Sequence, residues 1–203
     1  NLDIEIRYTL TNTNVWKVET RATSDKNTLF NPTNHVYFNL TGDVAQSVNE
    51  HTLWVDSDRF APLDLESVPI GVKLPVEGTA FDFRKPVKLK ETFSSNFVQK
   101  ELVDGIDHPF FLNRPELSHS SVKLTSPDEV VSIEIATKEP CVVIFTANFG
   151  ENTPLMRGKQ LANHGGITFE TQVCPGAEQF SNFGDMVLRA DSTYQTVTEF
   201  HII

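Results

Sequence analysis

The chain opens on a strict alternation of apolar and polar side chains. The apolar members are Leu2, Ile4, Ile6, Tyr8 and Leu10, and the polar members between them are Asp3, Glu5, Arg7 and Thr9. A period of two residues is typical of a β-strand with one face buried. The alternation returns over residues 16–22, after a turn at residues 11–14. The two segments therefore predict a hairpin whose first strand is half-buried.

The rest of the chain repeats this signal in short segments. Ten further strands are expected, at Val36–Leu40, Thr52–Asp56, Val87–Leu89, Phe110–Asn113, Ser121–Thr125, Val130–Thr137, Val142–Asn148, Ile167–Val173, Met186–Ala190 and Tyr194–Ile203. One helix is expected over Ser95–Val103, capped by Ser94 or Ser95, and a long irregular loop over Ser57–Gly78. Many short strands separated by turn residues predict an all-β fold, either an antiparallel sandwich or a barrel.

Charge and cysteine content exclude several classes of function. The 203 residues carry 17 Lys and Arg against 27 Asp and Glu, a net charge of −10. Nucleic-acid phosphates require clustered positive charge, so this balance argues against nucleic acid as a partner, and more weakly against an anionic membrane. No apolar run reaches the ~18 residues of a membrane span. Cys141 and Cys174 suit reduced, buried thiols, and we expect a cytoplasmic protein.

A polar row follows one face of the strand expected near residue 36. His35, Tyr37 and Asn39 share this face, while Val36 and Phe38 point to the core. Imidazole, phenol and amide groups can donate, accept and stack, and faces toward water rarely combine them. The row therefore suggests a concave surface that holds a polar ligand. The alternative is a structural histidine beside asparagine-rich turns.

Two carboxylates are further candidates for functional residues. Glu170 alternates with apolar residues and shares its face with Thr168 and Gln172, which could hold a general base oriented and ionised. Asp107 and His108 stand before a proline, so the backbone is extended and the two side chains point to opposite sides. The alternatives are an exposed strand glutamate and an aspartate that caps a turn.

These side chains suit a sugar better than a metal or a cofactor. A pyranose requires polar partners for its hydroxyl groups and an aromatic platform for its C–H face. The six histidines show no metal-binding spacing, and neither a nucleophilic-serine motif nor a glycine-rich phosphate loop occurs. The sequence therefore predicts no metal, no cofactor and a small-molecule sugar as partner.

Three motifs in this order resemble those of the aldose 1-epimerase (galactose mutarotase) family, and its bacterial members in particular. They are Asn31–Leu40 with Gly42, Gly105–Phe110 and Gly166–Gln172. The connecting segments Gly78–Arg84, Thr146–Phe149 and Arg157–Lys159 resemble the family as well. The similarity runs along essentially the whole chain. It implies an antiparallel, galactose mutarotase-like β-supersandwich that interconverts the α and β anomers of aldohexoses such as galactose or glucose without a cofactor.

The resemblance also implies roles for individual residues. His35 occupies the position of the family's general acid, Glu170 that of the general base, and Asp107 that of a carboxylate that binds sugar hydroxyls. Asn34 and Tyr37 beside His35 are expected to contact the substrate. Glu170 must stay ionised yet basic, so we expect partial burial and a modestly raised pKa. A homodimer is an open hypothesis.

Two departures from the family pattern keep other functions open. The family's longer members carry an Arg and a further His upstream of the region matched here, and some have a Gln at the place of Val143. Residues 1–203 are therefore expected to form a single domain, the C-terminal two-thirds of the sandwich, truncated at the N-terminus. The alternatives are a non-catalytic carbohydrate-binding β-sandwich and a glycosidase that uses Asp107 and Glu170 as a carboxylate pair.

Overall fold

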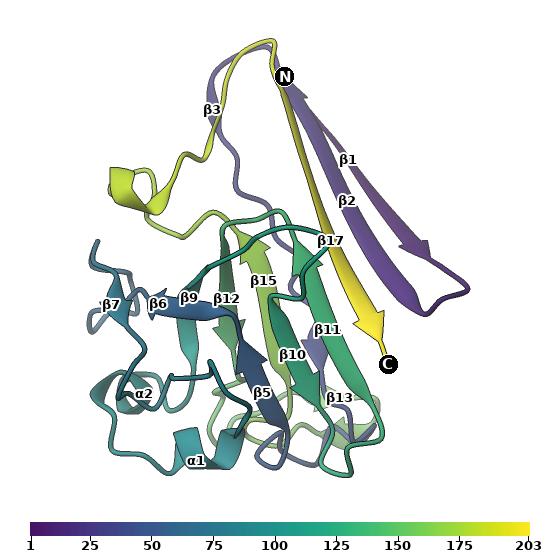
Figure 1. Cartoon of the computed structure of the whole chain (residues 1–203), viewed down its shortest axis with the longest axis vertical. Helices are drawn as coiled ribbons and strands as arrows, with labels where there is room; N and C mark the ends of the chain where they lie inside the picture. Colours follow the sequence, from purple (N-terminus) through teal and green to yellow (C-terminus); the bar gives the residue numbers. More distant parts are fainter.

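The computed structural model describes all residues from 1 to 203, and its regular structure is almost entirely β (Figure 1). The strands are β1 (Leu2–Leu10), β2 (Val15–Ser24), β3 (Thr28–Leu29), β4 (Tyr37–Phe38), β5 (Thr52–Val55), β6 (Ser57–Phe60), β7 (Leu74–Pro75), β8 (Val87–Lys88), β9 (Asp107–Leu112), β10 (Val122–Thr125), β11 (Ser132–Thr137), β12 (Cys141–Phe145), β13 (Leu155–Met156), β14 (Lys159–Gln160), β15 (Ile167–Gln172), β16 (Val187–Leu188) and β17 (Thr193–Ile202). The helices are α1 (Leu89–Phe93), α2 (Val98–Leu102) and the 3₁₀ turn η1 (Ser181–Phe183). No helix is both long enough and apolar enough to cross a membrane.

Two antiparallel sheets form the body of the molecule. The seven-stranded sheet has the order β1-β2-β17-β11-β10-β5-β8, and the six-stranded sheet has the order β4-β15-β12-β9-β6-β7. Two small ladders, β13–β14 and β16–β3, lie outside them. The all-β, antiparallel architecture predicted from the alternation is thus confirmed.

The core lies between the two sheets. It contains 21 buried residues, among them Leu53, Val122, Leu124, Ile135 and Phe200 from the larger sheet and Phe60, Phe110, Val142, Ile144 and Phe169 from the smaller one. Burial of each such side chain contributes about 1.5–3 kcal/mol. The two cysteines are buried and free, which confirms the expected reduced thiols. Apolar packing, rather than a covalent cross-link, therefore holds the sheets together.

The hairpin of β1 and β2 forms as predicted, with Leu2 opposite Ser24 and Leu10 opposite Trp16. The predicted half-burial of β1 is wrong, because all nine of its residues are exposed. Exposure in the apolar row reaches 73% at Leu10. The reason is the sheet order: β1 is the edge of the larger sheet, and β1, β2 and β17 extend beyond the smaller sheet (Figure 1).

Two other local predictions need correction. The expected loop over Ser57–Gly78 contains β6 and β7, and a bulge between Ser57 and Arg59 breaks the alternation that would have revealed them. The expected helix over Ser95–Val103 is shorter and begins at Val98, with Phe97 as its N-cap residue. Ser95 does not cap it, because its hydroxyl donates to the carbonyl of Thr92.

Candidate active site

The outward face of the six-stranded sheet gathers the polar residues singled out in the sequence. Strand pairing places Thr168 opposite both Tyr37 and Phe145, and Phe145 opposite Asp107. Paired residues in a sheet point to the same side, and residues two apart on a strand do so too. Glu170 therefore shares this face with Thr168, while Phe169 between them belongs to the core.

His35 and Glu170 meet on this face. His35 Nε2 lies 3.1 Å from Glu170 Oε1. The Thr168 hydroxyl donates to the same carboxylate oxygen at 2.9 Å, which fixes its orientation. The His35 side chain is 50% exposed and that of Glu170 is 11% exposed. The carboxylate thus forms the floor of the site, and the imidazole lies at its open edge.

Aromatic rings line the site beside this pair. The ring centroids of His35 and Tyr37 are 5.2 Å apart, those of Tyr37 and Phe145 are 6.3 Å apart, and those of Phe145 and Phe149 are 5.6 Å apart. The two phenylalanines were not predicted as site residues. Phe145 ends the continuously buried segment Cys141–Ile144, which has no alternation to indicate which face a residue takes. The site therefore has an apolar wall as well as a polar floor.

The carboxylates of the site share a negative, poorly solvated environment. Burial raises the pKa of Glu170, against the opposing effects of the Thr168 hydroxyl and of His35. The upward shift expected for this residue is thus confirmed. Burial, followed by the nearby charge of Glu170, raises the pKa of Asp107 to about 6. Burial and both carboxylates also raise the pKa of Tyr37. The face is therefore suited to accept protons and hydroxyl hydrogen bonds.

Two asparagines of the sequence motif lie outside this group. Asn34 lines a cavity of about 30 Å³ on the other side of the segment, together with Tyr8 and Thr171, and its buried Oδ1 has no hydrogen-bond partner. The Asn39 amide instead closes a turn, donating to the carbonyls of Gln46 at 2.8 Å and Gly165 at 3.0 Å. The structure thus brings together His35, Tyr37, Asp107 and Glu170, and not Asn34.

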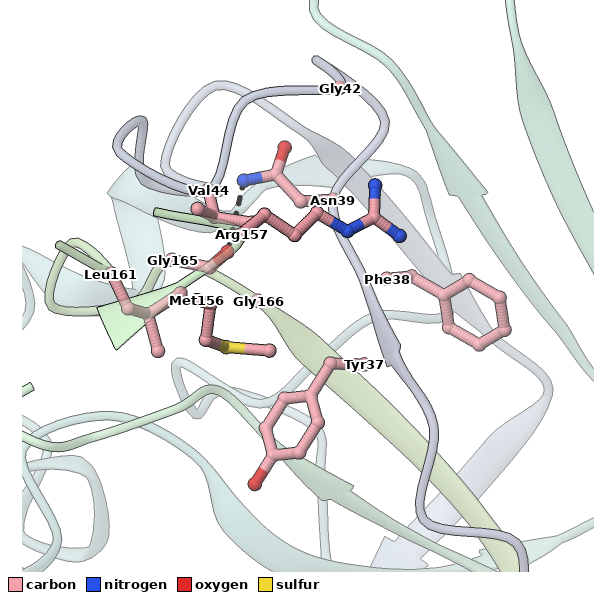
Figure 2. Close-up of a pocket in the computed structure, with 10 residues that line it drawn as sticks. All are labelled: Tyr37, Phe38, Asn39, Gly42, Val44, Met156, Arg157, Leu161, Gly165 and Gly166. Carbon is pink, nitrogen blue, oxygen red and sulfur yellow. Dashed lines mark hydrogen bonds between the residues drawn. The ribbon is translucent and has the colours of Figure 1, made fainter. Parts of the chain in front are cut away.

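A second pocket adjoins the site at Tyr37. Figure 2 shows its ten lining residues, which enclose about 140 Å³ and include Met156, Arg157 and the backbone of Gly165 and Gly166. None of its lining residues is a carboxylate or a histidine, so it holds no acid–base pair. No group of three or more His, Cys, Asp or Glu residues is placed to hold a metal ion anywhere in the chain. The contact of His35 with Glu170, beside aromatic rings, is the arrangement in this region that could transfer protons.

The backbone before Asp107 is held by side chains from the segment after β12. The Ile106 amide donates to the Thr146 hydroxyl at 2.9 Å, and the Ile106 carbonyl accepts from the Asn148 amide at 2.9 Å. Gly105 has a φ of +152°, and a Cβ atom added to it would lie 2.7 Å from Thr146 Oγ1. Only glycine fits the turn that leads into Asp107.

We expect Gly105→Ala to lower the free energy of unfolding by about 2–4 kcal/mol, because backbone strain and overlap with Thr146 and Asn148 add together. Urea denaturation measures this loss. The matched control is Gly42→Ala, at a φ of +75° with no atom within 4 Å of the added Cβ, where only the strain of about 1 kcal/mol applies. Equal losses at the two positions would contradict the packing argument.

We expect Asp107→Asn to stabilise the fold at pH 7 by about 1–2 kcal/mol, a value reduced for partial solvent access. The folded-state pKa of about 6 lies above the ordinary 3.8, so folding favours the protonated carboxyl. This contribution is complete below pH 3.8 and is lost as the pH rises through 6. The advantage of Asn should therefore shrink from pH 7 toward pH 4 in urea denaturation. An advantage independent of pH would contradict the raised pKa.

Comparisons with known proteins agree with this architecture. The family model described as Aldose 1-epimerase matches residues 1–201. The aldose 1-epimerase of Haemophilus influenzae is 34% identical over 98% of this chain, and human galactose mutarotase is 34% identical over 90%. A crystal structure of galactose 1-epimerase from Lactobacillus acidophilus matches the whole chain with a TM-score of 0.86 at 32% identity.

The match covers only part of these longer proteins. The chain corresponds to 59% of the length of the Haemophilus protein, 52% of the human protein and 57% of the Lactobacillus structure. Residues 1–201 match the family model, and the Lactobacillus structure matches the whole chain. This confirms the galactose mutarotase-like fold expected from the motifs. The chain therefore belongs to the aldose 1-epimerase family.

Proposed function

We propose that the chain carries the acid–base centre of an aldose 1-epimerase, which interconverts the α and β anomers of aldohexoses. The observation that supports this most directly is the 3.1 Å contact between His35 Nε2 and Glu170 Oε1. In a pyranose, the C1 hydroxyl oxygen and the ring oxygen are bonded to the same carbon. An acid and a base that serve these two oxygens must therefore be near neighbours, as His35 and Glu170 are.

In the proposed reaction, Glu170 takes the proton of the C1 hydroxyl while the imidazolium of His35 gives a proton to the ring oxygen. The bond between C1 and the ring oxygen breaks, and C1 becomes an aldehyde carbon. After rotation about the C1–C2 bond, His35 and Glu170 reverse their transfers and the ring closes on the other face. The raised pKa of Glu170 makes it a stronger base than an exposed carboxylate.

The remaining residues of the site suit the binding of a sugar. Asp107 can accept hydrogen bonds from ring hydroxyls, and the rings of Tyr37 and Phe145 offer an apolar surface to the C–H face of the sugar. Asn34, on the other side of its segment, has no part in this proposal. Protein and sugar exchange only protons, and the bond between C1 and the ring oxygen breaks and re-forms within the sugar, so no cofactor is required. A homodimer stays a prediction of the sequence.

We further propose a cytoplasmic location. Its support is the pair of free, buried cysteines, since cysteines in oxidising compartments are commonly paired.

Polarimetry tests the proposed activity. The 203-residue chain should relax the optical rotation of freshly dissolved α-galactose or α-glucose faster than buffer alone. Sugar binding without faster relaxation would instead favour the carbohydrate-binding sandwich. Release of a reporter aglycone from an aryl glycoside would favour the glycosidase. Either result would overturn the epimerase assignment for this chain.

A further inference from the structure

A fully buried histidine lies directly behind the sugar-binding carboxylate. His108 follows Asp107 on β9 and points to the opposite side of the sheet, as the sequence predicts. Its ring is packed against Phe60 and Phe81, with centroids 6.0 Å and 4.7 Å away. Burial lowers the pKa of His108 to about 3. The imidazole is therefore neutral at any pH at which the protein would work, and the proposed reaction does not use it.

The hydrogen bonds of His108 define one tautomer. The backbone amide of Asp107 donates to Nδ1 at 3.2 Å. An amide N–H can only donate, so Nδ1 carries no proton and the ring proton is on Nε2. Nε2 then donates to Gln99 Oε1 at 3.0 Å. A proton on Nδ1 would face another proton and leave both groups without an acceptor.

Gln99 is fixed in turn by the segment that follows β6. Its Oε1 also accepts from the Leu63 amide at 2.6 Å, and its Nε2 donates to the Leu63 carbonyl at 3.1 Å. Because the amide meets a donor on one side and an acceptor on the other, its orientation is determined. An ordered chain of hydrogen bonds thus runs from Leu63 through Gln99 and His108 to the backbone of Asp107.

The position of these hydrogen bonds in the sheet indicates what they stabilise. Strand β6, the neighbour of β9, ends at Phe60, and the Ala61 amide still donates to the Pro109 carbonyl. Two residues before Pro109 on β9, the amide of Asp107 donates to the His108 ring and not to a residue of a partner strand. A side chain therefore takes the place of a partner strand at the end of β9. The backbone from which the Asp107 carboxylate projects is held there.

We propose that His108 and Gln99 are positioning residues, which hold the Asp107 backbone so that its carboxylate meets the sugar hydroxyls. This role rests on the proposed function, because Asp107 matters only if a sugar binds this face. The hydrogen-bond chain itself does not depend on that function. Buried hydrogen bonds of this kind restrict motion only if every member is satisfied, and each of these groups is.

Two substitutions of His108 separate positioning from general stability. The shorter amide of His108→Asn can keep an acceptor near the position of Nδ1, whereas the longer amide of His108→Gln leaves the Asp107 N–H without one. We expect His108→Gln to raise the KM for galactose roughly tenfold, with a smaller effect on kcat, and His108→Asn to restore most of the loss. Equal losses in the two variants would overturn the proposal.

A double-substitution cycle provides the stricter test. If His108 acts through Asp107, His108→Gln should weaken sugar binding in the unaltered chain and add no loss in an Asp107→Ala background. The same loss in both backgrounds would indicate a merely structural role and contradict the proposal. If His108→Gln does not fold, Gln99→Met gives the same comparison, since it removes the acceptor of the ring proton together with the two hydrogen bonds to the Leu63 backbone.

Nitrogen NMR of the His108 ring separates this inference from the proposed activity. We expect a protonated Nε2 and an unprotonated Nδ1 throughout pH 5–8, whether or not the chain epimerises a sugar. Observation of the Nδ1–H tautomer would overturn the hydrogen-bond chain. If the expected tautomer is observed but the protein has no epimerase activity, the hydrogen bonds of His108 and Gln99 are upheld. Only the proposed function is then refuted.

Discussion

Replacing Glu170 by Gln is expected to lower the rate of mutarotation by about 10²–10⁴-fold, the usual contribution of a general base. Glutamine has the same shape and can still accept from the Thr168 hydroxyl, but it cannot take a proton from the sugar. The substitution also removes a carboxylate whose pKa burial has raised, so folding should lose no stability at neutral pH. The expected variant is folded and inactive.

Polarimetry measures the rate, and thermal unfolding checks the fold. The chain contains a matched control, because Glu199 on β17 lies 3.2 Å from His201, in an ion-pair geometry like that of the site. Glu199→Gln should leave mutarotation unchanged. A loss of activity in Glu170→Gln that follows a loss of fold, or an equal loss in Glu199→Gln, would refute the assignment of Glu170 as the base.

Substitution of His35 by Asn is expected to have an effect of similar size on the rate, again about 10²–10⁴-fold. Asparagine can donate a hydrogen bond to the ring oxygen, but it cannot deliver a proton to it. Because the His35 side chain is half exposed, the free energy of unfolding should change by less than about 0.5 kcal/mol. Polarimetry and urea denaturation of the same sample separate the two quantities.

The combined variant sharpens this second prediction. In the proposed reaction acid and base act in one concerted step, so the double variant His35→Asn with Glu170→Gln should lose little more than either single variant. His201→Asn is the matched control, and its activity should equal that of the unaltered chain. A His35→Asn rate within about twofold of the unaltered rate would exclude His35 as the acid.

The alternation of apolar and polar residues predicted the positions of the strands better than it predicted which strand faces are buried. The hairpin of β1 and β2 forms in the expected register, yet the apolar row from Leu2 to Leu10 is exposed. A period of two identifies a face that can pack, and carries no information about whether a second layer reaches it. Where the period is interrupted, as at the bulge after Ser57, the strand itself was missed.

The candidate site was predicted only in part, because residue parity along a strand gives the face of a side chain but not the neighbouring strand. The parity of residues along each strand placed His35 with Tyr37, and Glu170 with Thr168, on faces away from the core. It could not show that the two faces are one, because that depends on the pairing of β4 with β15. The chain path around Asn34 turns its amide away from this face, and the continuous burial of β12 concealed Phe145.

The sheet order also predicts different local stability for His35 and Glu170, the two partners of the proposed proton transfer. Glu170 belongs to the six-residue strand β15 and is paired there with Val143 of β12, whereas His35 precedes the two-residue edge strand β4. Segments of low local stability open most readily, and short edges are among them. In amide exchange, the backbone near His35 should open far more often than that of Glu170. The proposed acid would then adjust to the sugar while the proposed base stays fixed in the sheet.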